Sequence, residues 1–293
     1  MHELLDYIRH LVASGGPEPH QYDELNDWFH RVAAMVGDGE ITLPQVKAMW
    51  PVFGDAFSPQ TLQGFVVHRP HGYAGDFEII DRIHTHWLSP VAHLRNWDHF
   101  FHWHQAPRAV RNRKDYFKSL MAELDASGEP QRVLNVGSGP CRDVHEYLQE
   151  HPASHIHFEC IEQDEKAIAY ARALLGDADV TIHEQDAFRF KPGRTRYDLV
   201  WSAGLFDYLD DRQFVLLLKV LARTLRPGGE LVIGNFTEPN HSRAYMEFGG
   251  WFLNHRSEAQ LRTLVALSTL ACESVSVEQE PAGLNLFLRI RMA

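Results

Sequence analysis

The sequence predicts a doubly wound α/β domain that follows a long helical segment. Short apolar runs alternate with helical stretches from Gln131 onward, a glycine-rich turn follows the first run, and an acidic residue ends the second. Strands that alternate with helices form a parallel sheet covered on both faces, and small ligands bind at the carboxyl ends of its strands. These three observations together predict a ligand site at the start of the α/β domain.

Residues 1–128 show helical periodicity without convincing strand alternation, and the break Ser127–Pro130 separates them from the rest. We therefore expect a helical N-terminal segment over residues 1–128 and the α/β domain over residues 129–293. The segment is too long for a linker and has no obvious core pattern of its own. We expect it to form a lid that closes the open edge of the ligand site and keeps water away.

The composition narrows the classes of partner. The 293 residues carry a formal net charge of −11, and an acidic surface repels the phosphate backbones of DNA and RNA. The three cysteines have no close pairing, which favours a reducing compartment. The N-terminus has no long apolar run, and no stretch reaches the roughly 18 apolar residues of a membrane-spanning helix. We expect a soluble cytoplasmic protein that binds neither nucleic acid nor membranes.

The strands of the α/β domain are predicted in order from five apolar runs: RVLNV, IHFECI, VTIHE, YDLVWS and ELVIGNF. Such runs are typical of strands buried on both faces. Between the last two, the stretch Asp211–Leu225 repeats its apolar residues at helical spacing. At the end of the chain, ESVSVEQE and LNLFLRIRM are joined only by the short turn Pro281–Gly283, which is too short for a parallel crossover. The sheet should therefore end in a reversed strand.

The strongest local motif is VLNVGSGPCRDV, residues 133–144. Gly137-Ser138-Gly139 follows a strand and precedes a helix that starts at Pro140, and glycines let the backbone approach a ligand closely. The next strand ends at Glu162, where a carboxylate accepts hydrogen bonds from ribose hydroxyls. The loop and the acid together predict a nucleotide-like cofactor at the first strand.

Two cofactors suit this site, a dinucleotide and S-adenosylmethionine. A dinucleotide loop carries a third glycine that lets the helix pack closely, and Arg142 stands at that position here. The reversed strand at the end of the sheet also disfavours NAD. S-adenosylmethionine is therefore the predicted cofactor, and an NAD-dependent dehydrogenase is the alternative.

Residues 131–293 resemble the class I S-adenosylmethionine-dependent methyltransferases. The resemblance rests on LNVGSGP, Glu162, HEQDAF, YDLVWSAGLFDYL and LRPGGELVIGNF, in this order and spacing. It implies a seven-stranded Rossmann-like methyltransferase sheet with an antiparallel last strand, and an acid, Asp186, that meets the adenine amine. The cofactor-binding residues that it implies are Gly137, Ser138, Gly139, Glu162, Gln163, Asp186, Ala187, Phe188, Ser202, Ala203 and Gly204.

A narrower resemblance extends into the helical segment. HGYAGDFEIID, QAPRAVRNR and WFLNHRSEAQLRTL resemble a bacterial group named for the biosynthesis of 3-hydroxypalmitic acid methyl ester. After the fourth predicted strand, the stretch Ser202–Leu205 stands where nucleic-acid adenine methyltransferases carry an Asn/Asp-Pro-Pro-aromatic tetrad. This departure argues against DNA, and the resemblance implies a small acceptor such as a hydroxy fatty acid.

Polar residues outside the predicted strands are the candidates for catalysis and for the methionine end of the cofactor. Tyr73 and Asp76 lie in a glycine-containing turn and are expected to contact the cofactor amine or the acceptor, and His241 follows the fifth strand. The methionine carboxylate needs a cation, and a guanidinium suits it as a bidentate donor. We expect Arg113, in preference to Arg111, to fill this role.

The His-rich run from His93 to His104 is interleaved with tryptophan and phenylalanine. No cysteine or acidic residue completes a zinc spacing, so aromatic packing is favoured over a metal site. An acceptor pocket lined by these aromatic residues is a further possibility that the pattern leaves open.

The predicted function is methyl transfer from S-adenosylmethionine to a small molecule, either a secondary metabolite or a hydroxy fatty acid, on oxygen or nitrogen. A general base helps the reaction of a hydroxyl or a protonated amine acceptor, whereas a carboxylate is already ionised at neutral pH and needs none. A noncatalytic module that only binds S-adenosylmethionine is an alternative in a different class, and a protein acceptor is a third possibility.

Overall fold

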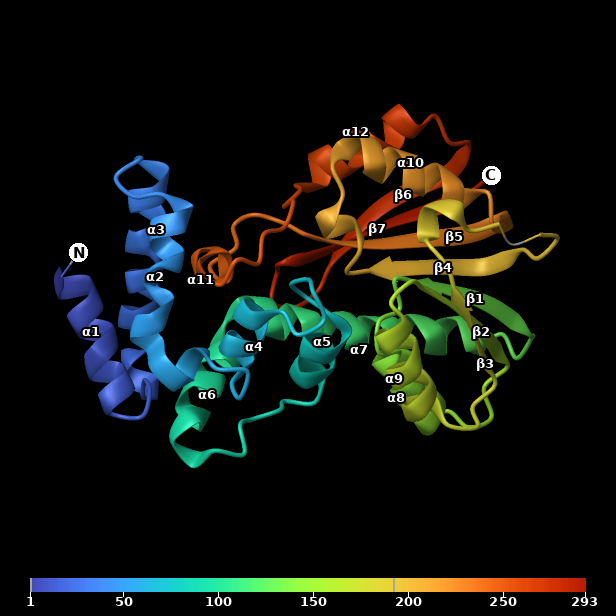
Figure 1. Cartoon of the computed structure of the whole chain (residues 1–293). Coiled ribbons are helices and arrows are strands. Elements are labelled where there is room, and N and C mark those ends of the chain that lie inside the picture. The colour runs from blue at the N-terminus through green and yellow to red at the C-terminus, as the bar shows by residue number, and fades with distance from the viewer. Residues whose placement is uncertain (1, 192) are drawn as a thin grey trace. The chain divides into compact units, whose positions relative to one another are not determined.

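The computed structural model describes residues 2–191 and 193–293, and the chain divides into two compact units. The helical unit comprises Met1–Arg108 and Asn240–Phe252, and the sheet unit comprises Ala109–Pro239 and Leu253–Ala293. Each unit is described by itself, with the element labels of Figure 1.

The described residues of the helical unit form helices and connecting turns, as predicted for the N-terminal segment. Its aromatic core joins α2 to η2 and α11: the Phe29 ring lies 5.1 Å from that of Phe248, and Trp28 lies 6.0 Å from Phe53, between ring centroids. The elements are α1 (His2–Ala13), η1 (Pro19–Gln21), α2 (Tyr22–Gly37), α3 (Leu43–Lys47), η2 (Trp50–Phe57), α4 (Leu62–His68), α5 (Phe77–His84), η3 (Ala92–Leu94), α6 (Arg95–Trp103) and α11 (Arg243–Phe248).

The His-rich run supports this aromatic core. The ring of His104 stacks on Tyr245 with centroids 4.3 Å apart, and His102 Nε2 lies 3.0 Å from the carbonyl oxygen of Trp87. Burial lowers the pKa of His104 to about 3, so this imidazole is neutral at physiological pH. Packing is therefore the role that the structure gives to His104.

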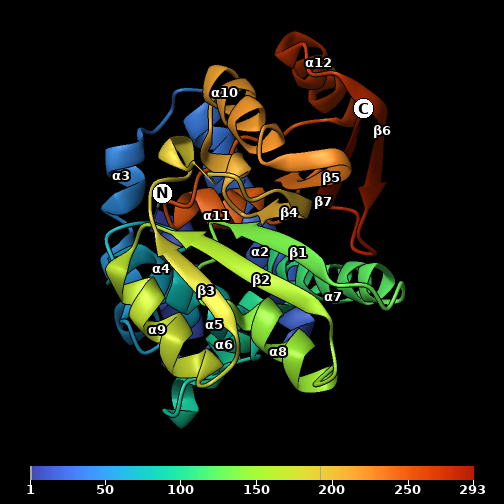
Figure 2. The same ribbon diagram turned by 90° about the vertical axis from the view of Figure 1, so that its right-hand side faces the viewer.

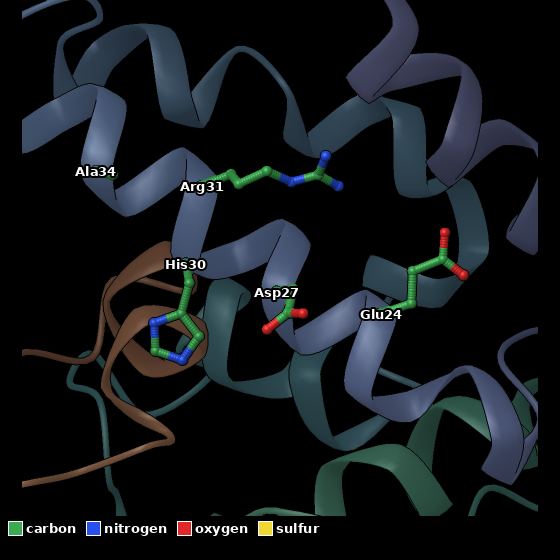
Figure 3. Close-up of a pocket in the computed structure, with 5 residues that line it drawn as sticks. All are labelled: Glu24, Asp27, His30, Arg31 and Ala34. Atoms are coloured by element: carbon green, nitrogen blue, oxygen red, sulfur yellow. The ribbon is translucent and has the colours of Figure 1, made fainter.

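Figure 3 shows a shallow hollow on the helical unit, and all the residues that line it come from α2. They are Glu24, Asp27, His30, Arg31 and Ala34. All five are exposed and recur at the spacing of one helix face. The hollow is therefore the solvated face of an amphipathic helix, and among the described residues only those of α2 line it.

The sheet unit contains a seven-stranded sheet with the order β3-β2-β1-β4-β5-β7-β6. Strands β1 to β5 are parallel, and β7 runs antiparallel to both β5 and β6. The strands are β1 (Gln131–Val136), β2 (Ile156–Glu162), β3 (Val180–Glu184), β4 (Tyr197–Ala203), β5 (Leu225–Phe236), β6 (Cys272–Gln279) and β7 (Asn285–Met292). The predicted Rossmann-like methyltransferase sheet with a reversed last strand is confirmed.

Helices cover both faces of this sheet, as Figure 2 shows. On one face α10 and α12 pack against Leu134 and Ile233, and on the other α8 and α9 pack against Val133 and Phe158. The alternation of strand side chains between the two faces explains why the strands are apolar throughout. The helices and short 3-10 turns are α8 (Arg142–Glu150), α9 (Glu165–Leu175), η4 (Ala187–Arg189), η5 (Phe206–Tyr208), α10 (Asp211–Ala222) and α12 (Glu258–Ser268).

Helix α7 (Gln105–Asp125) contributes its first residues to the helical unit, which continues to Arg108, and the rest to the sheet unit, which begins at Ala109. Its second half carries Phe117, Leu120 and Met121, which are buried in the same apolar cluster as β1 and β2. The predicted domain boundary between residues 128 and 129 follows this helix and stays a prediction. Residues 240–252 likewise join the helical unit.

None of the helices in the described part of the chain is both long enough and apolar enough to cross a membrane.

Candidate functional site

The glycine loop lies at the carboxyl end of β1, where the sequence places it. Gly137 and Gly139 have φ angles of +65° and +51°, in the left-handed region that favours glycine. The amides of Gly137 and Ser138 donate to the carbonyl oxygen of Ile161 at 2.9 and 3.2 Å. A Cβ on Gly137 would lie 3.3 Å from the Cβ of Leu205. The loop is therefore held between β2 and the segment that follows β4.

Glu162 ends β2 and is joined directly to this loop. Its Oε2 accepts the amide of Gly139 at 2.9 Å, and its Oε1 accepts the amides of Gln163 and Asp164 at 2.8 and 3.0 Å. A carboxylate offers about four lone-pair positions, so this arrangement leaves about one for a ligand hydroxyl. Asp164 caps α9 by accepting the amide of Lys166 at 2.9 Å. Glu162 is thus free of the capping role and remains partly exposed.

Asp186 follows β3 and caps the short turn η4. Its Oδ1 accepts the amide of Phe188 at 2.9 Å, and its Oδ2 lies 3.7 Å from Nε of the exposed Arg189. Ala187 and Phe188 are partly buried and pack against the core cluster that contains Ile161. One oxygen of Asp186 is therefore used by the backbone, and the proposed contact with adenine falls to the other.

At the end of β4, Ser202 has a structural role, whereas Ala203 and Gly204 are partly exposed. Ser202 is fully buried and donates its hydroxyl to the carbonyl oxygen of Val136 at 2.9 Å, which ties β4 to β1. Gly204 has a φ angle of +131°. The backbone approaches Arg113 closely at Gly204, since an added Cβ would lie 3.2 Å from Nη1.

Arg113, on α7, is a buried basic residue of the sheet unit. Its side chain is buried, with 8% of the residue exposed, and the described residues supply it with neither a hydrogen bond nor an ion pair. Burial lowers the pKa of Arg113, while the charges of Asp207, Tyr208 and Asp143 act to raise it. A buried guanidinium with five unused donors is costly unless an anion meets it. The carboxylate of a methionine group fits this requirement.

Two acids near Arg113 were missed by the sequence reasoning. Asp143 accepts Nδ2 of Asn135 at 3.2 Å, and Asp207 accepts the amide of Phe236 at 2.6 Å. Burial raises the pKa of each carboxyl to about 6, against the opposing effect of Arg113. Their positions after β1 and after β4 were the available signal, because residues that follow neighbouring parallel strands meet at one edge of a sheet.

The predicted catalytic residues Tyr73, Asp76 and His241 all belong to the helical unit. Asp76 is 1% exposed, and its Oδ1 caps α5 by accepting the amides of Glu78 and Ile79 at 3.0 and 2.9 Å. Burial raises the pKa of Asp76. This oxygen is a helix cap, which leaves Tyr73, 41% exposed, and the exposed His241 as the more accessible groups.

A polar cluster next to Tyr73 was also missed. His71 Nε2 lies 2.8 Å from Glu78 Oε2, and Arg82 donates to Glu78 Oε1 at 2.7 Å. The Arg82 guanidinium lies over the rings of Phe65 and Trp87, at 4.1 and 4.4 Å from their centroids. Although burial alone would raise it, the bonds from His71 and Arg82 hold the pKa of Glu78 below its ordinary value.

The structure therefore brings together the glycine loop, Glu162, Gly204 and Arg113 within the sheet unit. Gln163 and Asp186 follow the neighbouring strands β2 and β3. The roles of Tyr73, Asp76 and His241, and the lid formed by residues 1–128, stay predictions.

The sequence was compared with models of known protein families. The family model described as a methyltransferase domain matches residues 133–229, from β1 into the beginning of β5. Over these residues the chain is similar to a methyltransferase domain, which agrees with the predicted class of S-adenosylmethionine-dependent enzyme. None of the curated proteins matches the chain.

Solved structures share the fold. A protein from Bordetella parapertussis, described as a possible exported protein, is 20% identical, and the match covers 99% of this chain and 95% of that one with a TM-score of 0.61. The S-adenosylmethionine-dependent methyltransferase SibL, in its apo form, is 15% identical over 89% of this chain and 77% of its own, with a TM-score of 0.52. Magnesium protoporphyrin IX methyltransferase from Synechocystis PCC 6803, with bound S-adenosylhomocysteine, is 14% identical over 64% and 87%, with a TM-score of 0.50.

Proposed function

We propose that the chain transfers a methyl group from S-adenosylmethionine to a small molecule, and that the sheet unit holds the cofactor. The observation that carries the cofactor assignment is the buried Arg113 guanidinium, which makes no hydrogen bond or ion pair with the described residues and lies against Gly204. In this proposal Arg113 binds the methionine carboxylate, Glu162 binds the ribose, and Asp186 accepts the adenine amine. Ser138, Gln163, Ala187, Phe188, Ser202 and Ala203 complete the surroundings of the cofactor.

The cofactor supplies a methyl group on a sulfonium, which is already a good leaving group. The work left to the protein is to orient the two reactants in line and to exclude water. The glycine loop contributes close backbone approach, and Arg113 anchors one end of the cofactor. If the acceptor is a hydroxyl or a protonated amine, a general base helps the reaction, and Tyr73 and His241 are our candidates for it.

A small acceptor is favoured by three observations. The net charge of −11 opposes binding to nucleic acids, and Ser202–Leu205 lacks the tetrad of nucleic-acid adenine methyltransferases. Magnesium protoporphyrin IX methyltransferase, which shares the fold, is itself named for a small-molecule acceptor. We propose a hydroxy fatty acid or a secondary metabolite as the acceptor, with methylation on oxygen or nitrogen, in a cytoplasmic protein.

The cofactor assignment is tested by calorimetry with three probes: S-adenosylhomocysteine, 5′-methylthioadenosine and NAD. The wild-type chain should bind S-adenosylhomocysteine and not NAD. Arg113→Met should weaken S-adenosylhomocysteine about tenfold or more, the scale of one charge-assisted hydrogen bond, and leave 5′-methylthioadenosine unchanged because it lacks the carboxylate. Binding of NAD alone would instead favour the dehydrogenase.

Turnover is tested with S-adenosylmethionine labelled in the methyl group. The labelled methyl should appear on a member of a panel of 3-hydroxy fatty acids and aromatic hydroxy and amino compounds, and not on DNA. Cofactor binding without transfer to any of these, or to cell protein, would favour the noncatalytic module. Transfer to cell protein alone would overturn the small-molecule proposal.

A further inference from the structure

Arg256 lies in a segment that the proposed cofactor site does not include. Its side chain is buried, and its guanidinium donates to the segment after β4 and to the end of β5. Nη1 donates to the carbonyl oxygen of Phe206 at 3.2 Å, and Nη2 donates to the carbonyl oxygen of Leu209 at 2.6 Å. Nη1 also donates to Oδ1 of Asn235, at the end of β5, at 3.0 Å. One side chain therefore joins the loop after β4 to the end of β5.

The same guanidinium also fixes the start of α10. Nε and Nη2 both donate to Oδ1 of Asp211, at 3.1 and 3.0 Å, and the guanidinium carbon lies 4.9 Å from the centroid of the Phe214 ring. A planar guanidinium with its donors fixed in a fork suits several acceptors at once, whereas an ammonium does not. Arg256 therefore fixes both ends of the segment from Phe206 to Asp211.

Asn254 repeats this arrangement two residues earlier. Its backbone amide donates to the carbonyl oxygen of Asp207 at 2.7 Å, and its Nδ2 donates to the carbonyl oxygen of Leu209 at 3.1 Å. Its own carbonyl oxygen accepts Nδ2 of Asn235 at 2.9 Å. The loop after β4 is thus bonded along its length to the turn at residues 254–256.

The near end of this loop touches the proposed cofactor site. Gly204 is packed against the Arg113 guanidinium, so that an added Cβ would lie 3.2 Å from Nη1. Leu205 is packed against Gly137 of the glycine loop, where an added Cβ would lie 3.3 Å from the Cβ of Leu205. A shift of the loop would therefore move the backbone beside Arg113 and beside the glycine loop together.

We infer that Arg256, with Asn254, is a positioning residue that holds the loop Gly204–Leu209 against Arg113 and the glycine loop. This inference rests on the proposed function, because it assigns to the loop the placement of the methionine end of the cofactor. The hydrogen bonds that the described residues make with the Arg256 side chain go to Phe206, Leu209, Asp211 and Asn235, outside the proposed cofactor-binding residues. The effect of Arg256 is transmitted through the carbonyl oxygens of Phe206 and Leu209.

The test compares the affinities of full-length variants for S-adenosylhomocysteine and 5′-methylthioadenosine, which lacks the amino-acid end. Arg256→Met keeps the apolar stem over Phe214 and removes every side-chain bond, Arg256→Lys keeps the charge, and Asn254→Ala removes one bond to Leu209. Arg212→Met, at an exposed arginine of α10, is the matched control. Thermal unfolding shows which variants are folded.

Arg256→Met should weaken S-adenosylhomocysteine by about tenfold or more and 5′-methylthioadenosine by clearly less, and Arg256→Lys should recover part of the loss. Asn254→Ala should act in the same direction with a smaller effect, and it decides the matter if Arg256→Met does not fold. Equal losses for both probes would show a merely structural role, and unchanged affinities would show no role at all. If the wild-type chain binds neither probe, the proposed function fails before the variants are compared.

Discussion

The exchange of Glu162 for glutamine isolates the contribution of one carboxylate to cofactor binding. The amide keeps an oxygen at the position of Oε1, which accepts the amides of Gln163 and Asp164. It places an NH₂ group where Oε2 accepts the amide of Gly139, so that two donors face each other. The substitution therefore preserves the shape of the side chain, removes its charge, and releases the glycine loop.

The magnitude follows from the number of acceptor positions. Three backbone amides already occupy three of the roughly four lone-pair positions of the carboxylate, so about one bond to a ribose hydroxyl remains. A hydrogen bond to a charged group contributes about 1.5–3 kcal/mol, which corresponds to an affinity loss of about ten- to 150-fold. Loss of the bond to Gly139 adds to the effect by loosening the loop.

The assay is calorimetric titration with S-adenosylhomocysteine and 5′-methylthioadenosine at constant pH, with thermal unfolding as a check on the fold. Both ligands carry the ribose, so Glu162→Gln should weaken both to a similar extent, unlike Arg113→Met. Glu165→Gln, at an exposed acid in the first turn of α9, is the control and should change neither affinity. A folded Glu162→Gln variant with wild-type affinity for both ligands would refute the assignment of Glu162 to the ribose.

Three further substitutions test neighbouring parts of the site. Asp186→Asn keeps an oxygen for the cap on Phe188 but replaces the other by a donor, so affinity for S-adenosylhomocysteine should fall about tenfold at an unchanged melting temperature; unchanged affinity would leave Asp186 as a cap only. Gly204→Ala places a Cβ 3.2 Å from Arg113 at a φ angle of +131°, so the free energy of unfolding should fall by about 1–3 kcal/mol. The control Gly228→Ala, also at positive φ but facing open space, should lower it by less. Equal losses in the two variants would contradict the close approach to Arg113. Asp207→Asn removes a carboxyl whose pKa burial raises to about 6 in the folded chain, above its unfolded value near 3.9. Because the folded state holds this proton more tightly, wild type should lose stability relative to Asp207→Asn as pH rises from about 4 to about 7, and a difference that stays constant across that range in urea unfolding would refute the buried carboxyl.

The position of Arg113 in α7 determines how the proposed lid can be tested. A chain that begins near Ser127 would lack Arg113 together with Phe117 and Met121, which are buried in the core of the sheet unit. Such a fragment would lose affinity whether or not the helical unit acts as a lid. Tyr73→Phe in the full-length chain is the better test: the lid hypothesis expects slower turnover, and unchanged turnover would argue against a role for Tyr73.

The sequence by itself determined the features that depend on local pattern. The order of strands, the glycine loop after β1, the acid at the end of β2 and the reversed final strand all follow from the periodicity of apolar residues and from short turns. These signals are contained within a few neighbouring residues, because side-chain alternation and backbone turns are set locally. For this reason the predicted fold and cofactor class needed no tertiary information.

Only the tertiary structure decided which polar side chains lose their contact with water and what they meet there. Arg111 and Arg113 are both basic residues of one helix, yet two positions on a helix differ by about 200° in direction, and burial selects Arg113. Asp76 had the chemistry of a base, but its Oδ1 is used by the first turn of α5. Asp207 and Arg256 acquire their partners from segments 29 to 50 residues away, so no local pattern marks them. Burial and pairing of charges arise from packing between distant segments, and that is why these roles became visible only in the folded chain.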